Sequence, residues 1–466
     1  MKNKTLLTLA LGLAGVTSVM ATTVDVYLTG STAFRANVYT ACTKLYSGGP
    51  SAIYFGDSNH GGAASGFSSS TAAWVMTGTP ITQLTNLAGV TLNIHGLFTG
   101  SIQGIQTTIQ NTKLTFPNVG GVNTNNGLCG AYVNNTPTIG FSDSASAACP
   151  YQVGSGYAEE EVAVIPFVMV KAVGSGFAAN VLTNISNVTW EQMEYGIPNG
   201  YLPLSAWTYK NSDTNTFIYL LQRTLDSGTR RCETAGMYYQ YGDPCGTYIY
   251  DTTANNFFYP TQSVLTASAS GLAPNGVVGS AGLGNANLNW GYGYVGGGQI
   301  ASALNSTGSS NTSISFLSMS DAKSVFPSTQ TNWWNVVSFN GMWPTTAGAG
   351  IHGLNLASAN PTNDFSPITS GYYPLWGKEV CAFPLNPKGT IADQNISQAQ
   401  MGTGSKAGTF MGVFNAQTSV QTNLPAPLAG SIENEIELSK TSLATAIRLS
   451  EMKVGRDSVG AVIYPK

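Results

Sequence analysis

The chain has 466 residues, of which only 9 % are charged, against about a quarter in an ordinary soluble domain. Lysine and arginine together number 19 and aspartate and glutamate 22, a balance that argues against a basic nucleic-acid-binding surface. Hydrophobic residues make up 42 %, which excludes disorder from low apolar content and supplies a large core. The polar surface must come from Ser, Thr, Asn and Gly, a composition typical of an exported bacterial protein.

The N-terminal segment, residues 1–21, has the pattern of a cleavable export signal. Two lysines precede an apolar run over residues 6–19, which is followed by small residues at the expected cleavage point. No cysteine stands directly after it to carry a lipid anchor, and no later stretch is long and apolar enough to span a membrane. The mature protein is therefore expected to be periplasmic or secreted and not membrane-spanning.

Six cysteines follow this segment, and an even number behind an export signal is typical of disulfides. Two pairs are close in sequence and the remaining two would form a long-range link: Cys129 with Cys149, Cys232 with Cys245, and Cys42 with Cys381. The chain contains no Cys-x-x-Cys and only 3 histidines, so we expect no metal site and no cofactor.

The first part of the chain alternates strands and helices. A strand over residues 24–28 runs through a turn into a helix from residue 33 to about residue 46. A second strand over 90–94 precedes a helix near Ile102, and a third covers 138–143. Because turns follow all three strands, the sequence predicts three strand ends of similar design.

The second part continues this alternation. Residues 162–170 form a continuous apolar run, typical of a strand buried on both faces. A strand over 217–221 runs towards Arg223, and an amphipathic helix is expected over 432–454. Further strands are expected at 314–317, 372–383 and 458–464. Strands alternating with helices indicate an α/β fold.

Three strand-to-helix junctions combine glycine with hydroxyl side chains: Gly30-Ser31-Thr32, Gly100-Ser101 and Ser227-Gly228-Thr229. The first amides of a helix have no intrahelical partner, and the helix dipole favours negative charge there. Glycine also lets the backbone approach a ligand closely. Each junction is therefore a candidate anion receptor, whereas one such turn alone is most often a plain helix cap.

Two charged residues lie at further strand ends. Arg223 comes four residues before Ser227, and a guanidinium makes two parallel charge-assisted bonds to an oxyanion. Asp143 follows the strand residues 139–141 and has the opposite charge, which repels an anion unless that anion has a proton to donate. Phosphate has such a proton and sulfate has none, so Asp143 predicts selectivity for phosphate. The alternative for Arg223 is a surface arginine or a partner for Asp226. The alternative for Asp143 is a cap on the next helix.

These segments resemble the periplasmic phosphate-binding proteins of bacterial ABC importers, in the type II periplasmic-binding-protein superfamily. The segment LTGSTAF at 28–34 looks like the first phosphate loop of that family, and GSIQGI at 100–105 is similar to its Gly-Ser-Ser-Gly-Gly turn. GFSD at 140–143 is similar to its Gly-x-Ser-Asp segment. RTLDSGT at 223–229 matches its Arg-x-Asp-Gly-Ser-Gly-Thr signature at both ends, with the same spacing.

The resemblance implies nine ligand-contacting residues: Ser31, Thr32, Phe34 through its amide, Ser101, Asp143, Arg223, Ser227, Gly228 and Thr229. It departs from the family pattern at Ile102, where the family has a serine, and at Leu225-Asp226, where it has Asp-Gly. The ligand implied is inorganic phosphate or a related oxyanion, and the partner implied is the membrane permease of an ABC importer.

The resemblance also implies a two-lobed α/β fold, each lobe a mixed sheet flanked by helices. Lobe 1 would comprise residues 22–168 and 316–466, with insertions at about 47–90 and 106–137, and lobe 2 residues 169–315. Two crossover segments, near 166–170 and 314–317, would form the hinge of a cleft that closes on phosphate.

The sequence also bears on two other classes of function. No Gly-x-Ser-x-Gly or other catalytic signature has its usual context, so we do not expect an enzyme. The low charge and the polar insertions also suit a cell-surface or matrix protein, structural or adhesive, that reuses the fold with a weakened or lost anion site. Retention of both Arg223 and Asp143 favours the binding protein over this alternative.

Overall fold

The computed structural model describes most of residues 22–384 and short pieces beyond. The described residues are 22–57, 67, 71–82, 84, 87–120, 127–148, 151, 153–154, 156–225, 227–237, 239, 245–251, 254–259, 277–278, 293–294, 296–323, 335–345, 365–384, 447, 452–456 and 463–465. The expected export signal and Cys149 lie outside them, as do most of the helix expected over 432–454 and the start of the strand expected over 458–464.

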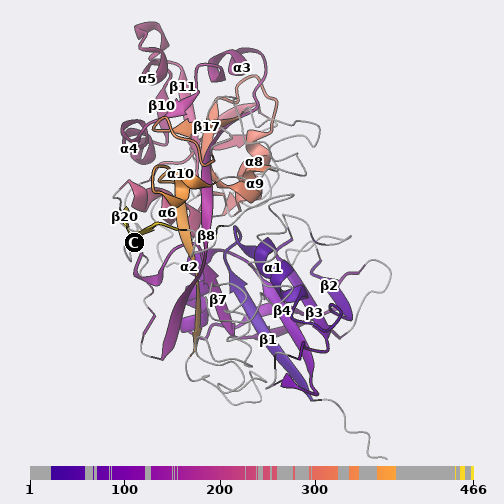
Figure 1. Ribbon diagram of the computed structural model, residues 1–466. Coiled ribbons are helices and arrows are strands. Elements are labelled where there is room, and N and C mark those ends of the chain that lie inside the picture. The colour runs from indigo at the N-terminus through magenta and orange to yellow at the C-terminus, as the bar shows by residue number, and fades with distance from the viewer. Residues whose placement is uncertain are drawn as a thin grey trace, which may run out of the picture.

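The molecule has two lobes that share one sheet of 12 strands, ordered β10-β11-β16-β8-β18-β7-β1-β4-β3-β2, with β17 paired to β8 and β9 (Figure 1). The strands of the lower lobe in that view are β1 (Thr23–Gly30), β2 (Ala52–Phe55), β3 (Ala73–Gly78), β4 (Thr91–Leu97) and β7 (Ile139–Ser142). Those of the upper lobe are β9 (Asn187–Val188), β10 (Tyr201–Pro203), β11 (Phe217–Leu221), β16 (Ser313–Ser318) and β17 (Val336–Phe339). The sheet is mixed and helices flank it, so the two-lobed α/β fold class is confirmed.

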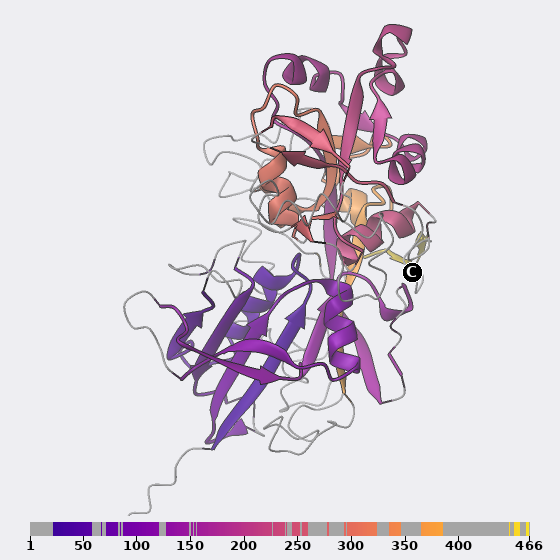
Figure 2. The same cartoon turned by 180° about the vertical axis from the view of Figure 1, so that it is seen from behind.

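Helices cover both lobes, as the view from behind also shows (Figure 2). They are α1 (Arg35–Thr43), α2 (Ser101–Ile109), α3 (Gly176–Leu182), α4 (Trp190–Asn199), α5 (Ser205–Thr208), α6 (Gly228–Gly236), α8 (Gly297–Leu304), α9 (Met319–Lys323) and α10 (Ser366–Thr369). Short 3-10 helices lie at Ser146–Ala148 and Asn211–Asp213. Small two-stranded sheets pair β5 (Leu114–Asn118) with β6 (Ala131–Asn135), β12 (Ile249–Asp251) with β13 (Asn256–Phe258), β14 (Val277–Val278) with β15 (Gly293–Tyr294), and β19 (Val454–Arg456) with β20 (Ile463–Pro465).

Parallel pairing brings the predicted strand ends to one edge of the sheet. β1 pairs in parallel with β4, from Thr23 opposite Thr91 to Thr29 opposite Leu97, and with β7 on its other side. In the upper lobe β11 runs parallel to β16. The carboxyl ends of parallel strands lie at the same edge, where ligands of open α/β sheets bind. The turns after β1, β4 and β7 are therefore neighbours in space.

The strand β8 (Tyr157–Lys171) joins the two lobes. Its first part pairs with β18 (Trp376–Pro384) as far as Pro166, opposite Trp376, and its last part pairs with β16 from Phe167, opposite Ser318. Proline has no amide hydrogen to donate, and Pro166 stands where the partner changes. The two predicted hinge segments thus pair with each other, while their role as a hinge and the lobe boundaries stay predictions.

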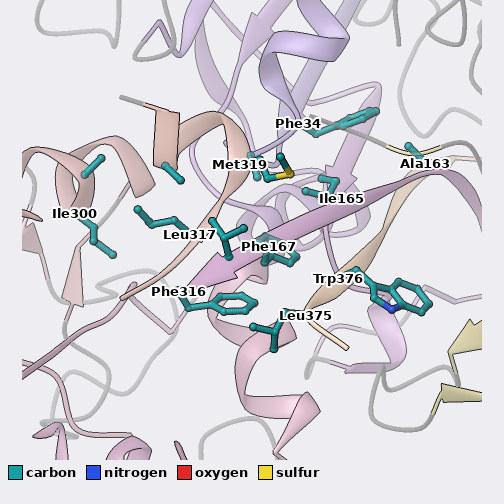
Figure 3. Close-up of a cluster of buried hydrophobic side chains, with 14 of the residues drawn as sticks. Phe34, Ala163, Ile165, Phe167, Ile300, Phe316, Leu317, Met319, Leu375 and Trp376 are labelled. Atoms are coloured by element: carbon teal, nitrogen blue, oxygen red, sulfur yellow. The ribbon is translucent and has the colours of Figure 1, made fainter. Parts of the chain in front are cut away.

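Apolar side chains fill the junction around β8 (Figure 3). The rings of Phe167 on β8 and Phe316 on β16 stack with their centroids 4.8 Å apart, and Leu375 lies beside them. Phe34, which precedes α1, and Met319, which opens α9, are both buried there. Each buried side chain of this size contributes about 1.5–3 kcal/mol to the free energy of folding, so this cluster stabilises the junction between the lobes.

Three expectations need correction. The insertion expected at 47–90 is rich in Gly, Ser and Thr, which predicts loops, but it contains β2 and β3, which extend the main sheet as antiparallel strands. Ile447, inside the expected helix over 432–454, instead pairs with Val164 in an isolated bridge. The thiols of five cysteines are free, so the Cys232–Cys245 and Cys42–Cys381 bridges are not formed. Cys232 donates to the carbonyl of Asp143 at 2.9 Å and Cys245 to Oε1 of Gln222 at 2.6 Å.

Candidate functional site

The turn after β1 is fixed by backbone contacts to the end of β7. Gly30 has φ +119°, a conformation that favours glycine, and an added Cβ would collide with the backbone of Phe141. The amide of Ser31 donates to the carbonyl of Phe141 at 2.9 Å. The hydroxyl of Ser31 accepts from the amide of Phe34 at 3.1 Å. This turn therefore directs the start of α1 to the edge where β7 ends.

Asp143 lies at the centre of the candidate site and is 1 % exposed. Its Oδ1 accepts from the hydroxyl of Ser101, the first residue of α2. Its Oδ2 accepts from the hydroxyl of Thr229, in the first turn of α6, at 2.9 Å. Burial raises the pKa of Asp143 above 3.8, whereas the two hydroxyls and the charge of Arg223 act in the opposite direction. Asp143 is therefore a buried acceptor between two helix starts.

The start of α6 packs directly onto this carboxylate. Ser227 is the N-cap of α6, and its hydroxyl accepts from the amide of Arg230 at 3.3 Å. An added Cβ on Gly228 would overlap Oδ1 of Asp143 and would lie 2.6 Å from Cβ of Ser101. Only glycine therefore lets the backbone of α6 come this close to Asp143 and Ser101.

Arg223 reaches across to the turn after β1. It follows β11 and is 3 % exposed. Its Nε donates to the carbonyl of Tyr294 at 3.2 Å, which fixes the side chain within the upper lobe. Its Nη2 donates to the hydroxyl of Thr32 in the lower lobe at 3.4 Å. The guanidinium thus lies between the two lobes, close enough to Asp143 for the two charges to interact.

All nine predicted site residues are described, and all nine are buried. Direct contacts link Ser101, Asp143 and Thr229 in one group and Thr32 and Arg223 in another. The hydroxyls of Ser31 and Ser227 instead accept from amides of their own turns. A hydroxyl that accepts still has its own proton to donate.

Sequence reasoning missed two buried charged residues at this site. Arg35 opens α1, is 6 % exposed, and has a pKa lowered by burial and by the charge of Arg223. Glu379 on β18 is fully buried, and neither of its carboxyl oxygens has a hydrogen-bond partner within the part of the chain described. Burial and the charge of Asp143 raise the pKa of Glu379 well above 4.5. The sequence signal that could have identified Arg35 and Glu379 is the rarity of charged residues, which make up only 9 % of the chain.

Among the described residues, no group of three or more His, Cys, Asp or Glu side chains is placed to hold a metal ion. The helices of this part of the chain include none that is long and apolar enough to cross a membrane.

No protein-family model matches the chain, and no curated protein matches it. Solved structures are similar to it at low identity. One is a phosphate-binding protein from Stenotrophomonas maltophilia, with 12% identity, a TM-score of 0.36, and coverage of 92% of this chain and 91% of that chain. Another is an ABC-type phosphate transport receptor from Vibrio cholerae, with 11% identity, a TM-score of 0.33, and coverage of 80% of this chain and 94% of that chain.

Proposed function

We propose that this protein is an exported solute-binding protein that captures phosphate, or a similar tetrahedral oxyanion, where its two lobes meet. The observation that carries the proposal is a pair of buried groups of opposite charge, the guanidinium of Arg223 and the carboxylate of Asp143, among three helix starts. Helix N-termini and a guanidinium both bind oxyanions. A buried carboxylate adds an acceptor for a proton on the ligand.

The acceptor supports phosphate over sulfate as the ligand. Both oxygens of Asp143 already accept hydroxyl protons, and a ligand O–H would take the place of one of these donors. Monohydrogen phosphate carries such a proton. Sulfate carries none, so one of its oxygens would face the carboxylate without a proton between them, a repulsive contact that provides specificity.

Capture would couple to movement of the lobes. Thr32, Ser101 and Asp143 belong to the lower lobe and Arg223 and Thr229 to the upper lobe, so one ligand would bond to both. Such a ligand favours the closed arrangement over the open one. We propose lobe 2 as residues 169–315 together with α9 and β17, which lie in the upper lobe (Figure 1), lobe 1 as residues 22–168 and the rest of 316–466, and a hinge at 166–170 and 314–317. The closed form would dock on the permease of an ABC importer.

Thermal unfolding of the protein from residue 22 onward tests the proposal. A ligand at about 100 times its Kd stabilises the folded state by about 2.7 kcal/mol, so phosphate should raise the Tm and sulfate should leave it unchanged. Arg223→Ala should abolish the phosphate response. The substitution itself should cost about 1 kcal/mol of stability for each of the two hydrogen bonds that it removes, to Tyr294 and to Thr32.

The exposed Lys113→Gln is the matched control, since it removes a positive charge outside the site and should keep the response. Wild-type affinity in Arg223→Ala would contradict the assignment. No response to any oxyanion would instead favour the cell-surface or matrix alternative, structural or adhesive.

A further inference from the structure

Arg35 is held at the site by few contacts of its own. It is the first residue of α1, directly after Phe34, and its side chain is 7 % exposed. Its Nη2 lies 3.9 Å from Oδ1 of Asp321, which is an ion pair but beyond hydrogen-bond distance. Its Nε has no hydrogen-bond partner within the described residues. A buried guanidinium with an unsatisfied donor is rare and needs an explanation.

The surroundings of Arg35 increase this cost. Arg223, from the other lobe, is close enough for its charge to lower the pKa of Arg35. Two buried like charges repel unless an anion lies near both. Asp321 opens the first turn of α9, and its Oδ2 accepts from the hydroxyl of Ser318 at 3.0 Å. The carboxylate of Asp321 is therefore also fixed by its hydrogen bond from Ser318, and its ion pair with Arg35 is long rather than bidentate.

We infer that Arg35 is a second ligand-binding guanidinium of the oxyanion site, and that with Arg223 it makes the site select the dianion of phosphate over the monoanion. This inference rests on the proposed function. The dianion HPO₄²⁻ carries two negative charges, one for each guanidinium, and one proton, for Asp143. The monoanion carries one negative charge fewer, so it would offset less of the repulsion between these two buried guanidinium groups than the dianion does.

Other charged and titratable groups also lie near the site. Asp321 on α9 and Arg223 after β11 interact with Arg35, and Asp143 and Glu379 interact with each other beside Ser31. Phosphate changes between monoanion and dianion near neutral pH, with a second pKa of about 6 in its esters. A comparison of variants at the same pH separates the role of Arg35 from titration of the carboxyls, which all variants keep.

Calorimetric titration with inorganic phosphate at about pH 6 and about pH 8 tests the inference, because this range spans the change of ligand charge. The wild type should bind more tightly at the higher pH. Arg35→Gln should raise the Kd at the higher pH at least tenfold and remove most of the difference between the two pH values. Lys113→Gln, which removes an exposed charge, should match the wild type.

Arg35→Lys provides a second variant should Arg35→Gln fold poorly. It keeps the charge and loses the planar fork, so it should bind more weakly than the wild type and keep the pH dependence. A wild-type Kd in Arg35→Gln, or an unchanged pH dependence, would overturn the inference while leaving the proposed function in place. A wild type that binds no phosphate at either pH would overturn both.

Discussion

The hydroxyl of Thr229 donates to Oδ2 of Asp143 across 2.9 Å, between residues 86 positions apart in the chain. Thr229 lies in the first turn of α6 in the upper lobe, and Asp143 directly follows β7 in the lower lobe. This bond connects the lobes at the carboxylate that also accepts from Ser101. Changes at Asp143 should therefore affect both ligand choice and the contact between the lobes.

Asp143→Asn should reduce discrimination between phosphate and sulfate. The amide keeps the shape of the carboxylate but removes its charge and one acceptor, so a sulfate oxygen is no longer repelled. We expect the ratio of the sulfate Kd to the phosphate Kd to fall at least tenfold, equivalent to about 1.4 kcal/mol. Competition calorimetry measures this ratio. An unchanged ratio would show that Asp143 does not select the ligand.

Gly228→Ala should prevent α6 from approaching Asp143. The added methyl group would overlap Oδ1 of Asp143 and press on Ser101, so we expect the phosphate Kd to rise at least tenfold. Gly298 is the matched control, because it also lies in the first turn of a helix, α8, and the nearest atom to its added Cβ is 4.0 Å away. Gly298→Ala should leave the Kd unchanged. Equal affinity in both variants would argue against a close approach at Gly228.

Glu233→Gln should flatten the dependence of stability on pH. Glu233 on α6 is 3 % exposed, and burial raises its pKa from 4.5 to about 8. Because this folded-state pKa lies above the unfolded one, the stability that Glu233 contributes is complete below about pH 4.5 and is lost as the pH rises through about 8.

The glutamine stays neutral, so denaturant unfolding should show a smaller loss of stability between about pH 5 and about pH 8 in the variant, by at least 1.4 kcal/mol, about one pKa unit. Parallel pH profiles of wild type and variant would contradict a buried, neutral Glu233. Lys113→Gln serves again as the control at an exposed position.

Cys232 and Cys245 should react slowly with thiol reagents in the native protein. Burial raises the pKa of the Cys245 thiol to about 11 and that of Cys232 well above 9.0, and the thiolate is the reactive form. Unfolding without reductant should release both thiols to Ellman's reagent. An intact mass two hydrogens lower, with Cys232 and Cys245 recovered in one bridged peptide, would restore the predicted disulfide.

Local sequence patterns predicted the turns of the site but not the buried charged residues beside them. Gly30, Gly100 and Gly228 could be located because a strand, a glycine and a hydroxyl residue stand next to one another in the sequence. Arg35 and Glu379 were missed because their surroundings come from distant segments: Asp321 on α9 contacts the first, and Asp143 after β7 acts on the second.

The fold shows the same division between local and distant information. The apolar run over 162–170 predicted only the second half of β8, which begins at Tyr157, because three consecutive glutamates interrupt the hydrophobic pattern there. The polar composition of 47–90 hid β2 and β3, which are strands because they pair with the edge of an existing sheet. The disulfides were predicted from an even number of cysteines in an exported protein, a signal that carries no information on the distances between those cysteines in the fold.

The strand β8 has one consequence for how the molecule denatures. The strand β8 pairs with strands on both sides of the junction between the lobes, since Pro166 pairs with β18 and the next residue with β16. Melting of either lobe by itself would strip one partner from a strand that the other lobe needs, and would expose Phe167 and its neighbours to water. The two halves should therefore lose their structure together, in one cooperative transition, although the polypeptide has length enough for two independent folding units.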